Sequence, residues 1–146
     1  MKWLASCFLV LAMGVVAAPL QSPVPQSESR FMAYLVKHTP TELEYLFQRA
    51  AMLAQDSSEV RQHEPIVFIL HGDETFAFLN ANAQRFSNLI GLARQLDEQH
   101  IIDVRVCEAW MLDHGIQRAD LPDFIDTVPN GPEYGRQLKQ SGYLYF

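Results

Sequence analysis

One run of five apolar residues limits the fold of this chain more narrowly than any other feature. Ile66, Val67, Phe68, Ile69 and Leu70 follow a proline and end at a His-Gly pair. Apolar and polar side chains do not alternate within the run, so a strand formed here would be buried on both of its faces. Strands of that kind occur in parallel sheets whose two faces are covered by helices. The run therefore predicts an α/β fold.

Strand-like and helix-like segments alternate along the rest of the folded part. Thr39, Pro40 and Glu42 indicate the start of a helix, because they supply an N-cap, a first-turn proline and a carboxylate that can bond back to the cap. We expect strands at residues 31–36, 66–70, 101–107, 124–128 and 143–146, and helices at residues 39–55, 86–96, 108–114 and 130–142. This βαβαβαβαβ order predicts a parallel sheet with helices on both faces and right-handed crossovers.

The N-terminal residues have the features of a secretory signal peptide. Lys2 precedes an apolar stretch over residues 3–18, and Val15 and Ala17 stand at the spacing that signal peptidase reads. A membrane anchor is the alternative, but the stretch is shorter than the roughly 20 residues needed to span a bilayer. We expect a signal peptide at residues 1–17, a flexible leader at residues 18–29 and one folded domain at residues 30–146. This organisation predicts a periplasmic protein without a membrane segment after cleavage.

The net charge argues against nucleic acid as a partner. The chain has 146 residues and a formal net charge of −6. An acidic surface repels phosphate backbones and anionic lipid head groups, and no cluster of Lys or Arg overrides this average. A Walker loop and a glycine-rich dinucleotide motif after a strand are both absent from the sequence, so we expect no nucleotide cofactor. The histidines do not occur at metal-ligand spacing, so we expect no metal site.

A single cysteine remains once the expected signal peptide is removed. Cleavage takes away Cys7 and leaves Cys107. The remaining chain cannot form an internal disulfide, although export normally favours disulfides. Cys107 is therefore either an inert buried residue or a thiol with a chemical role, and both alternatives stay open.

The expected carboxyl ends of the strands collect the candidate site residues, because ligands of parallel sheets bind outside these ends. The residues expected there are His71, Gly72, Asp73, Cys107, Glu108 and Asn130. A helix start directly after Cys107 favours its thiolate form, whereas Glu108 and Asp73 disfavour it by charge repulsion, so the balance stays open. On geometry alone, His71 is either a hydrogen-bond partner of the thiol or a simple turn residue.

Four short motifs follow one another in the second half of the chain. They are IVFILHG at residues 66–72, VRVC at 104–107, VPNG at 128–131 and LKQSGYLY at 138–145. In this order and spacing, residues 65–146 resemble the exported, periplasmic branch of the DsrE/DsrF-like family. The resemblance implies a three-layer α/β/α domain with a five-stranded parallel sheet that assembles into oligomers. It also implies that Cys107 carries sulfur as a persulfide, because it matches the cysteine with that role in cytoplasmic relatives. Glu108 stands where many relatives have a small residue.

Three functions follow as hypotheses. The first is a periplasmic sulfur-handling protein, a carrier or a sulfurtransferase, that holds sulfane sulfur as a persulfide on Cys107. Its partners would be a sulfur donor or acceptor protein or a small sulfur compound, and a homo-oligomer is expected. The second is a non-catalytic oligomeric binding module that uses the apolar segments 76–79 and 143–146 for subunit or partner contacts. The third is a periplasmic small-ligand or redox-sensing protein, marked by oxidation of Cys107.

Overall fold

The computed structural model describes residues 29–35, 38–56 and 64–146. Its strands, α-helices and short 3₁₀ helices (η) follow in the order β1 (Phe31–Leu35), α1 (Pro40–Asp56), β2 (Ile66–Leu70), η2 (Asp73–Phe78), η3 (Asn80–Asn82), α2 (Ser87–Glu98), β3 (Ile102–Cys107), α3 (Glu108–Asp113), η4 (Arg118–Asp120), β4 (Asp126–Val128), α4 (Gly131–Gln140) and β5 (Leu144–Tyr145). The expected signal peptide and all of the expected leader except Ser29 lie outside the described residues. Within the described ranges, no helix combines the length and the apolar character needed to cross a bilayer.

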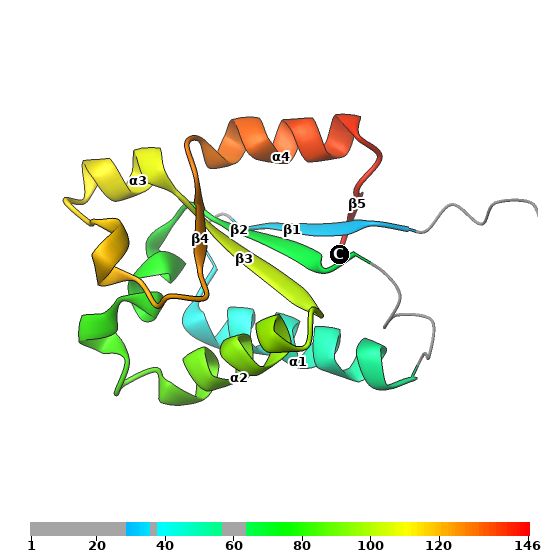
Figure 1. The fold of residues 1–146 in the computed structure, drawn as a ribbon, viewed down its shortest axis with the longest axis horizontal. Coiled ribbons are helices and arrows are strands. Elements are labelled where there is room, and N and C mark those ends of the chain that lie inside the picture. Colours follow the sequence, from blue (N-terminus) through cyan, green and yellow to red (C-terminus); the bar gives the residue numbers. More distant parts are fainter. Residues whose placement is uncertain (1–28, 36–37, 57–63) are drawn as a thin grey trace, which may run out of the picture.

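The five strands form one sheet in the order β4-β3-β2-β1-β5, and every neighbouring pair is parallel. Tyr34 of β1 lies beside Ile69 of β2, which in turn lies beside Arg105 of β3. Helices α1 and α2 cover one face of the sheet, and α4 covers the other (Figure 1). The expectation of a three-layer α/β/α fold around five parallel strands is confirmed.

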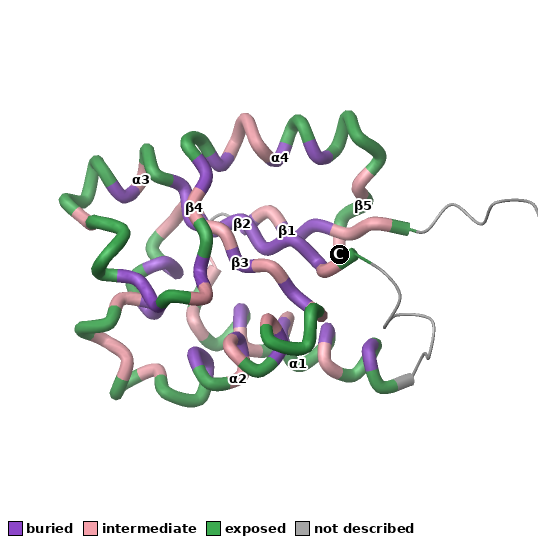
Figure 2. Tube along the Cα trace, in the orientation of Figure 1, coloured by how far each residue is buried: buried purple, intermediate pink, exposed green. Residues whose placement is uncertain are grey.

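The larger of two apolar cores lies between the sheet and helices α1 and α2. Phe47 of α1 meets Phe68 of β2 edge to face, with ring centres 4.9 Å apart, and also meets Phe78 of η2. A smaller cluster lies between the sheet and α4 and consists of Met32, Val67, Ile69 and Leu138. Strand β2 is therefore buried along its whole length (Figure 2), which explains why its sequence does not alternate.

The expected N-cap of α1 is present. The backbone N–H of Thr39 donates to Oε2 of Glu42 over 2.7 Å, and the N–H of Glu42 donates to Oγ1 of Thr39 over 3.2 Å. This reciprocal pair satisfies donors that the start of a helix leaves free. The bonds from the backbone and then from the hydroxyl of Thr39 hold the pKa of Glu42 below its usual value.

Several elements begin or end one or two residues from their expected boundaries. The stretch before α2, where no helix was expected, contains the two 3₁₀ helices η2 and η3. Strand β4 begins only at Asp126, because the N–H of Ile125 donates to the carbonyl of Pro122 in a turn. Strand β5 begins only at Leu144, because the N–H of Tyr143 donates to the carbonyl of Leu138 and closes α4. In the last two segments, residues whose side chains suit a strand form turn hydrogen bonds instead and so lie outside the sheet.

Candidate functional site

The segments that follow β3 and β4 lie on opposite faces of the sheet. The segments that leave β1, β2 and β3 pack into the larger core, through residues such as Phe47, Leu96 and Ile125. The segment that leaves β4 is α4, which covers the opposite face (Figure 1). Neighbouring strands that continue toward opposite faces leave a crevice outside their carboxyl ends, where ligands of parallel sheets bind. In this chain the rule points to the ends of β3 and β4, and Cys107 is the last residue of β3.

Cys107 lies under the N-terminus of α4. The N–H of Gly131, the first residue of α4, donates to Sγ of Cys107 over 3.2 Å, and the cysteine is only 3% exposed. A backbone N–H at the positive end of a helix is a donor that stabilises a thiolate or a persulfide anion. The sequence had placed the thiol against the start of α3. Its hydrogen-bond donor comes instead from the helix after the next strand.

Gly131 is the residue around which the candidate site is packed. A Cβ atom at this position would lie 3.2 Å from Cβ of Cys107, 3.2 Å from Cγ2 of Ile69 and 3.3 Å from Cβ of His71. These distances are shorter than ordinary van der Waals contacts, so a side chain here would require its neighbours to shift by a few tenths of an ångström. Cys107 and His71 therefore both lie close to Gly131, on the side where a Cβ atom would be.

His71 contacts Tyr34, a residue that was not among the sequence candidates. The two rings stack at a tilt with centroids 4.7 Å apart, and Nε2 of His71 is buried without a hydrogen-bond partner among the described residues. Burial raises the pKa of Tyr34, and the nearby Cys107 raises it further. Alternation of side chains along β1 could have identified Tyr34, because it places Tyr34 on the α4 side of the sheet together with Met32. We call Cys107, His71, Tyr34 and Gly131 the thiol site.

The other candidates after β2 lie apart from the thiol. The N–H groups of His71 and Gly72 donate to Oε1 of Glu74 over 3.1 and 2.9 Å. Glu74 is fully buried, and its Oε2 has no hydrogen-bond partner within the described ranges. Asp73 is exposed at the first position of η2. Glu74, which was not among the sequence candidates, therefore holds the turn that positions His71.

Asn130 supports the thiol site through the backbone. It is exposed and forms the N-cap of α4, where its Oδ1 accepts the N–H of Glu133 over 2.9 Å. An N-cap fixes the first turn of a helix. The Asn130 cap thus fixes the position of the Gly131 N–H, which donates to the sulfur of Cys107.

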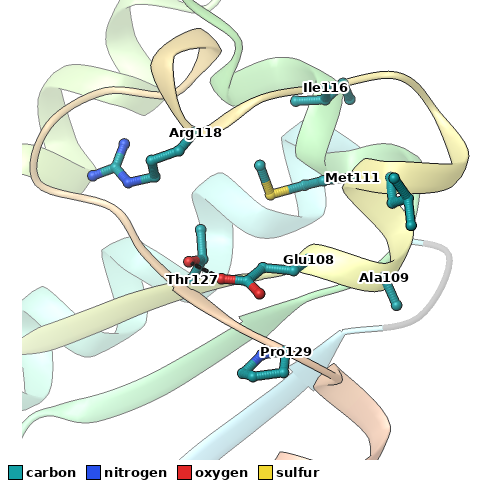
Figure 3. A pocket seen from close by; sticks show the side chains of 8 residues that line it. Glu108, Ala109, Met111, Ile116, Arg118, Thr127 and Pro129 are labelled. Carbon is teal, nitrogen blue, oxygen red and sulfur yellow. Dashed lines mark hydrogen bonds between the residues drawn. The ribbon is translucent and has the colours of Figure 1, made fainter.

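Glu108 lines a separate hollow outside the ends of β3 and β4. Its Oε1 accepts the hydroxyl of Thr127 over 2.6 Å (Figure 3). The hollow has a volume of about 530 Å³ and is lined by Glu108, Ala109, Met111, Leu112, Ile116, Arg118, Thr127 and Pro129. The sequence had treated the Glu108 carboxylate as a neighbour that repels the thiolate. In the structure it is held by Thr127, in the wall of a hollow that Cys107 does not line. We call this space the α3–β4 hollow.

A smaller hollow of about 290 Å³ lies on the α4 side, and Tyr34 is part of its wall together with Arg136 and Lys139. Arg136 forms an ion pair with Glu133, and its charge lowers the pKa of Tyr34 against the effects that raise it. Positive charge therefore lies beside the thiol site. Within the described part of the chain, no three side chains of the His, Cys, Asp or Glu type gather as metal ligands.

Comparison with known proteins supports the fold alone. No family model and no curated protein matches the chain. The structure of MTH1491, a protein of unknown function from Methanobacterium thermoautotrophicum, is similar over 81% of this chain and 97% of that chain, with a TM-score of 0.66 and 14% sequence identity. At this identity the similarity shows a shared α/β/α fold, and a fold of this kind serves many functions.

Proposed function

We propose that this chain is a sulfur-handling protein of the exported DsrE/DsrF-like branch and carries sulfane sulfur as a persulfide on Cys107 in the periplasm. The observation that supports this function is the hydrogen bond from the Gly131 N–H to Sγ of Cys107, 3.2 Å long, at the carboxyl end of β3. A persulfide anion formed on this sulfur would keep a helix N-terminus close to its negative charge.

Sulfur transfer at this thiol needs no separate oxidant or reductant. The Cys107 thiolate attacks the outer sulfur of a donor persulfide, so that an S–S bond forms at Cys107 while the S–S bond of the donor breaks. The donor leaves as a thiolate and takes the proton that Cys107 released. An acceptor thiolate then attacks the outer sulfur on Cys107, and the Cys107 thiolate is the leaving group.

The charges near the thiol site favour an anionic donor. Arg136 and Lys139 line the smaller hollow that also contains Tyr34, and Tyr34 stacks on His71 beside the thiol. Positive charge along an approach raises the local concentration of small anions. A small anionic sulfur compound, such as a polysulfide, therefore fits this site, and a donor protein would need to present its persulfide at the same place.

The burial of Cys107 sets a condition for this chemistry. The cysteine is 3% exposed, so a donor reaches Sγ only when the segment of residues 129–131 moves away from the end of β3. Local openings of this type cost less free energy than global unfolding. We therefore expect sulfur loading to proceed at a rate set by this opening.

Mass spectrometry after incubation with polysulfide tests the proposal. The full sequence has two cysteines, Cys7 and Cys107, so the Cys7→Ser variant is compared with a variant that carries both Cys7→Ser and Cys107→Ser. We expect the mass of one added sulfur atom in the Cys7→Ser variant and none in the double variant. An adduct that persists in the folded double variant contradicts the proposal.

The second candidate function is a non-catalytic oligomeric binding module. Two observations favour it: the burial of Cys107, and the exposure of large apolar side chains on α1, α3 and β5, namely Tyr45, Met52, Leu112, Leu144 and Tyr145. Exposed apolar groups of this size are typical of contact surfaces. A native protein that sediments as an oligomer while Cys107 takes up neither sulfur nor alkylating reagent would support this second function.

A further inference from the structure

The α3–β4 hollow is a cavity that the thiol chemistry does not use. It lies outside the carboxyl ends of β3 and β4, the position at which parallel α/β sheets bind small molecules. Its volume of about 530 Å³ is within the range of roughly 300–1,000 Å³ that is usual for such sites. Cys107 is not part of its wall, so a ligand here would not touch the proposed persulfide.

Apolar side chains make up most of the wall. Met111 enters the space from α3 (Figure 3), and Leu112, Ile116 and Pro129 complete the apolar surface. Leu112 is 80% exposed, so part of this surface meets water in the free protein. An apolar group that fills the hollow removes this surface from water, at about 25 cal/mol for each Å². The wall thus favours a ligand with a compact apolar body.

The polar groups of the wall decide the charge of the ligand. Arg118 directs its guanidinium N–H groups to the backbone carbonyls of Leu121, Pro122 and Asp123, at 3.4, 3.1 and 3.0 Å. These bonds use at most three of the five guanidinium N–H groups and direct the group toward the chain itself. The guanidinium points away from Glu108 in Figure 3.

Glu108 is the acceptor that remains for a ligand. The Thr127 hydroxyl donates to one carboxylate oxygen over 2.6 Å and so orients the group from the neighbouring strand. A carboxylate has about four lone-pair sites, so one bond from Thr127 leaves acceptor capacity for a cationic donor. Bonds of an ammonium group to a carboxylate are stronger than neutral hydrogen bonds.

We propose that the α3–β4 hollow binds a small apolar molecule that carries a primary amine in its ammonium form. The apolar body lies against Met111, Ile116 and Pro129, and the ammonium group donates to the carboxylate of Glu108. Thr127 acts as the positioning residue for that carboxylate. This site does not depend on the sulfur chemistry at Cys107.

Three probes of equal size and different charge test the proposal on the purified protein: phenethylamine, 2-phenylethanol and phenylacetate. Binding is followed by NMR through the methyl groups of Met111 and Ile116. We expect the amine to bind roughly three- to fivefold more tightly than the alcohol, which is the size of an exposed ion pair, and phenylacetate to bind most weakly. Equal binding of the three probes, or no response of these methyl groups to the amine, overturns the proposal.

Variants separate the carboxylate from the apolar wall. Glu108→Gln should remove the advantage of the amine and leave the affinity for 2-phenylethanol unchanged. Thr127→Val should reduce the same advantage through the orientation of Glu108, and it provides a second test if Glu108→Gln folds poorly. Glu98→Gln is the matched control. Glu98 is an exposed glutamate at the end of α2, which leads into the amino end of β3, and the hollow lies at the carboxyl end. An amine affinity that is the same in Glu108→Gln and Glu98→Gln contradicts the proposal.

Discussion

Gly131 lies where three side chains converge, so a side chain at this position should disturb the packing. An alanine there would place its methyl group 3.2–3.3 Å from Cys107, Ile69 and His71, which belong to two strands and the turn after β2. We expect Gly131→Ala to lower the free energy of unfolding by about 1–3 kcal/mol, as overpacked cores do, when measured by urea denaturation. The methyl group should also displace the N–H from Sγ of Cys107 and speed the alkylation of the thiol.

Gly91 is the matched control for this substitution. It lies in the middle of α2, and a Cβ atom added there would have no neighbour within 4 Å. Alanine is preferred over glycine in a helix by about 0.5–1 kcal/mol, so Gly91→Ala should raise the free energy of unfolding. Equal effects of the two substitutions would show that α4 does not press on the sheet as described.

Tyr143 gives the protein a dependence on alkaline pH. Burial, followed by the hydrogen bond to Glu64 over 2.6 Å, raises its pKa from 10.0 to about 12. The folded state therefore keeps the phenol proton in a range where the unfolded state loses it. The stabilisation is complete below pH 10 and is lost as the pH rises toward about 12. Chemical denaturation at several pH values should show this loss in the native chain and less of it in Tyr143→Phe.

At the scale of elements, the N-terminus of α4 is the part on which the thiol site depends. Asn130→Ala removes the acceptor of the Glu133 N–H, and the usual cost of a lost N-cap is about 0.5–2 kcal/mol. We expect this loss in urea denaturation, together with faster alkylation of Cys107, because the first turn of α4 frays away from the sulfur. Asn130→Asp keeps an acceptor at the cap and serves as the control. Unchanged alkylation in folded Asn130→Ala would contradict the role given to the cap.

Because α4 crosses to the second face, the last residue of β3 and the first residue of α3 belong to two different sites. Cys107 faces the Gly131 N–H, whereas Glu108, the next residue, starts α3 and bonds to Thr127 on β4. The two side chains therefore serve different spaces although they are adjacent in sequence. A negative charge at Glu108 is consequently compatible with an anionic sulfur at Cys107, because Thr127 holds the carboxylate in the wall of the other hollow.

At the scale of the whole molecule, the burial of the thiol makes its reactivity a measure of how the fold opens. Cys107 is 3% exposed, so iodoacetamide should modify it much more slowly in the native protein than in urea-unfolded protein. If only residues 129–131 move, the modification rate should change little at urea concentrations below the unfolding transition, because little surface is exposed. A rate that follows global unfolding at every urea concentration would exclude a local opening, and with it the proposed sulfur loading of the folded protein.

Local signals in the sequence predicted the fold because they act over a few residues. The unbroken apolar run of β2 and the reciprocal cap of Thr39 and Glu42 both occur as expected. Boundaries were less accurate at β4 and β5, where turn bonds of Ile125 and Tyr143 override strand-like side chains. The same local signals located the end of β3 and so brought Cys107 into the candidate list.

The sequence by itself determined that strands and helices alternate and which residues stand at the strand ends, because hydrophobic period and capping chemistry are properties of neighbouring residues. Only the tertiary structure decided what those end residues contact. It placed the N–H of Gly131, 24 residues after Cys107, on the sulfur and enclosed that sulfur, stacked Tyr34 on His71, and turned Glu108 to Thr127. These contacts depend on the order of strands in the sheet and on the face that α4 covers, and distances between such segments are not encoded in any local pattern.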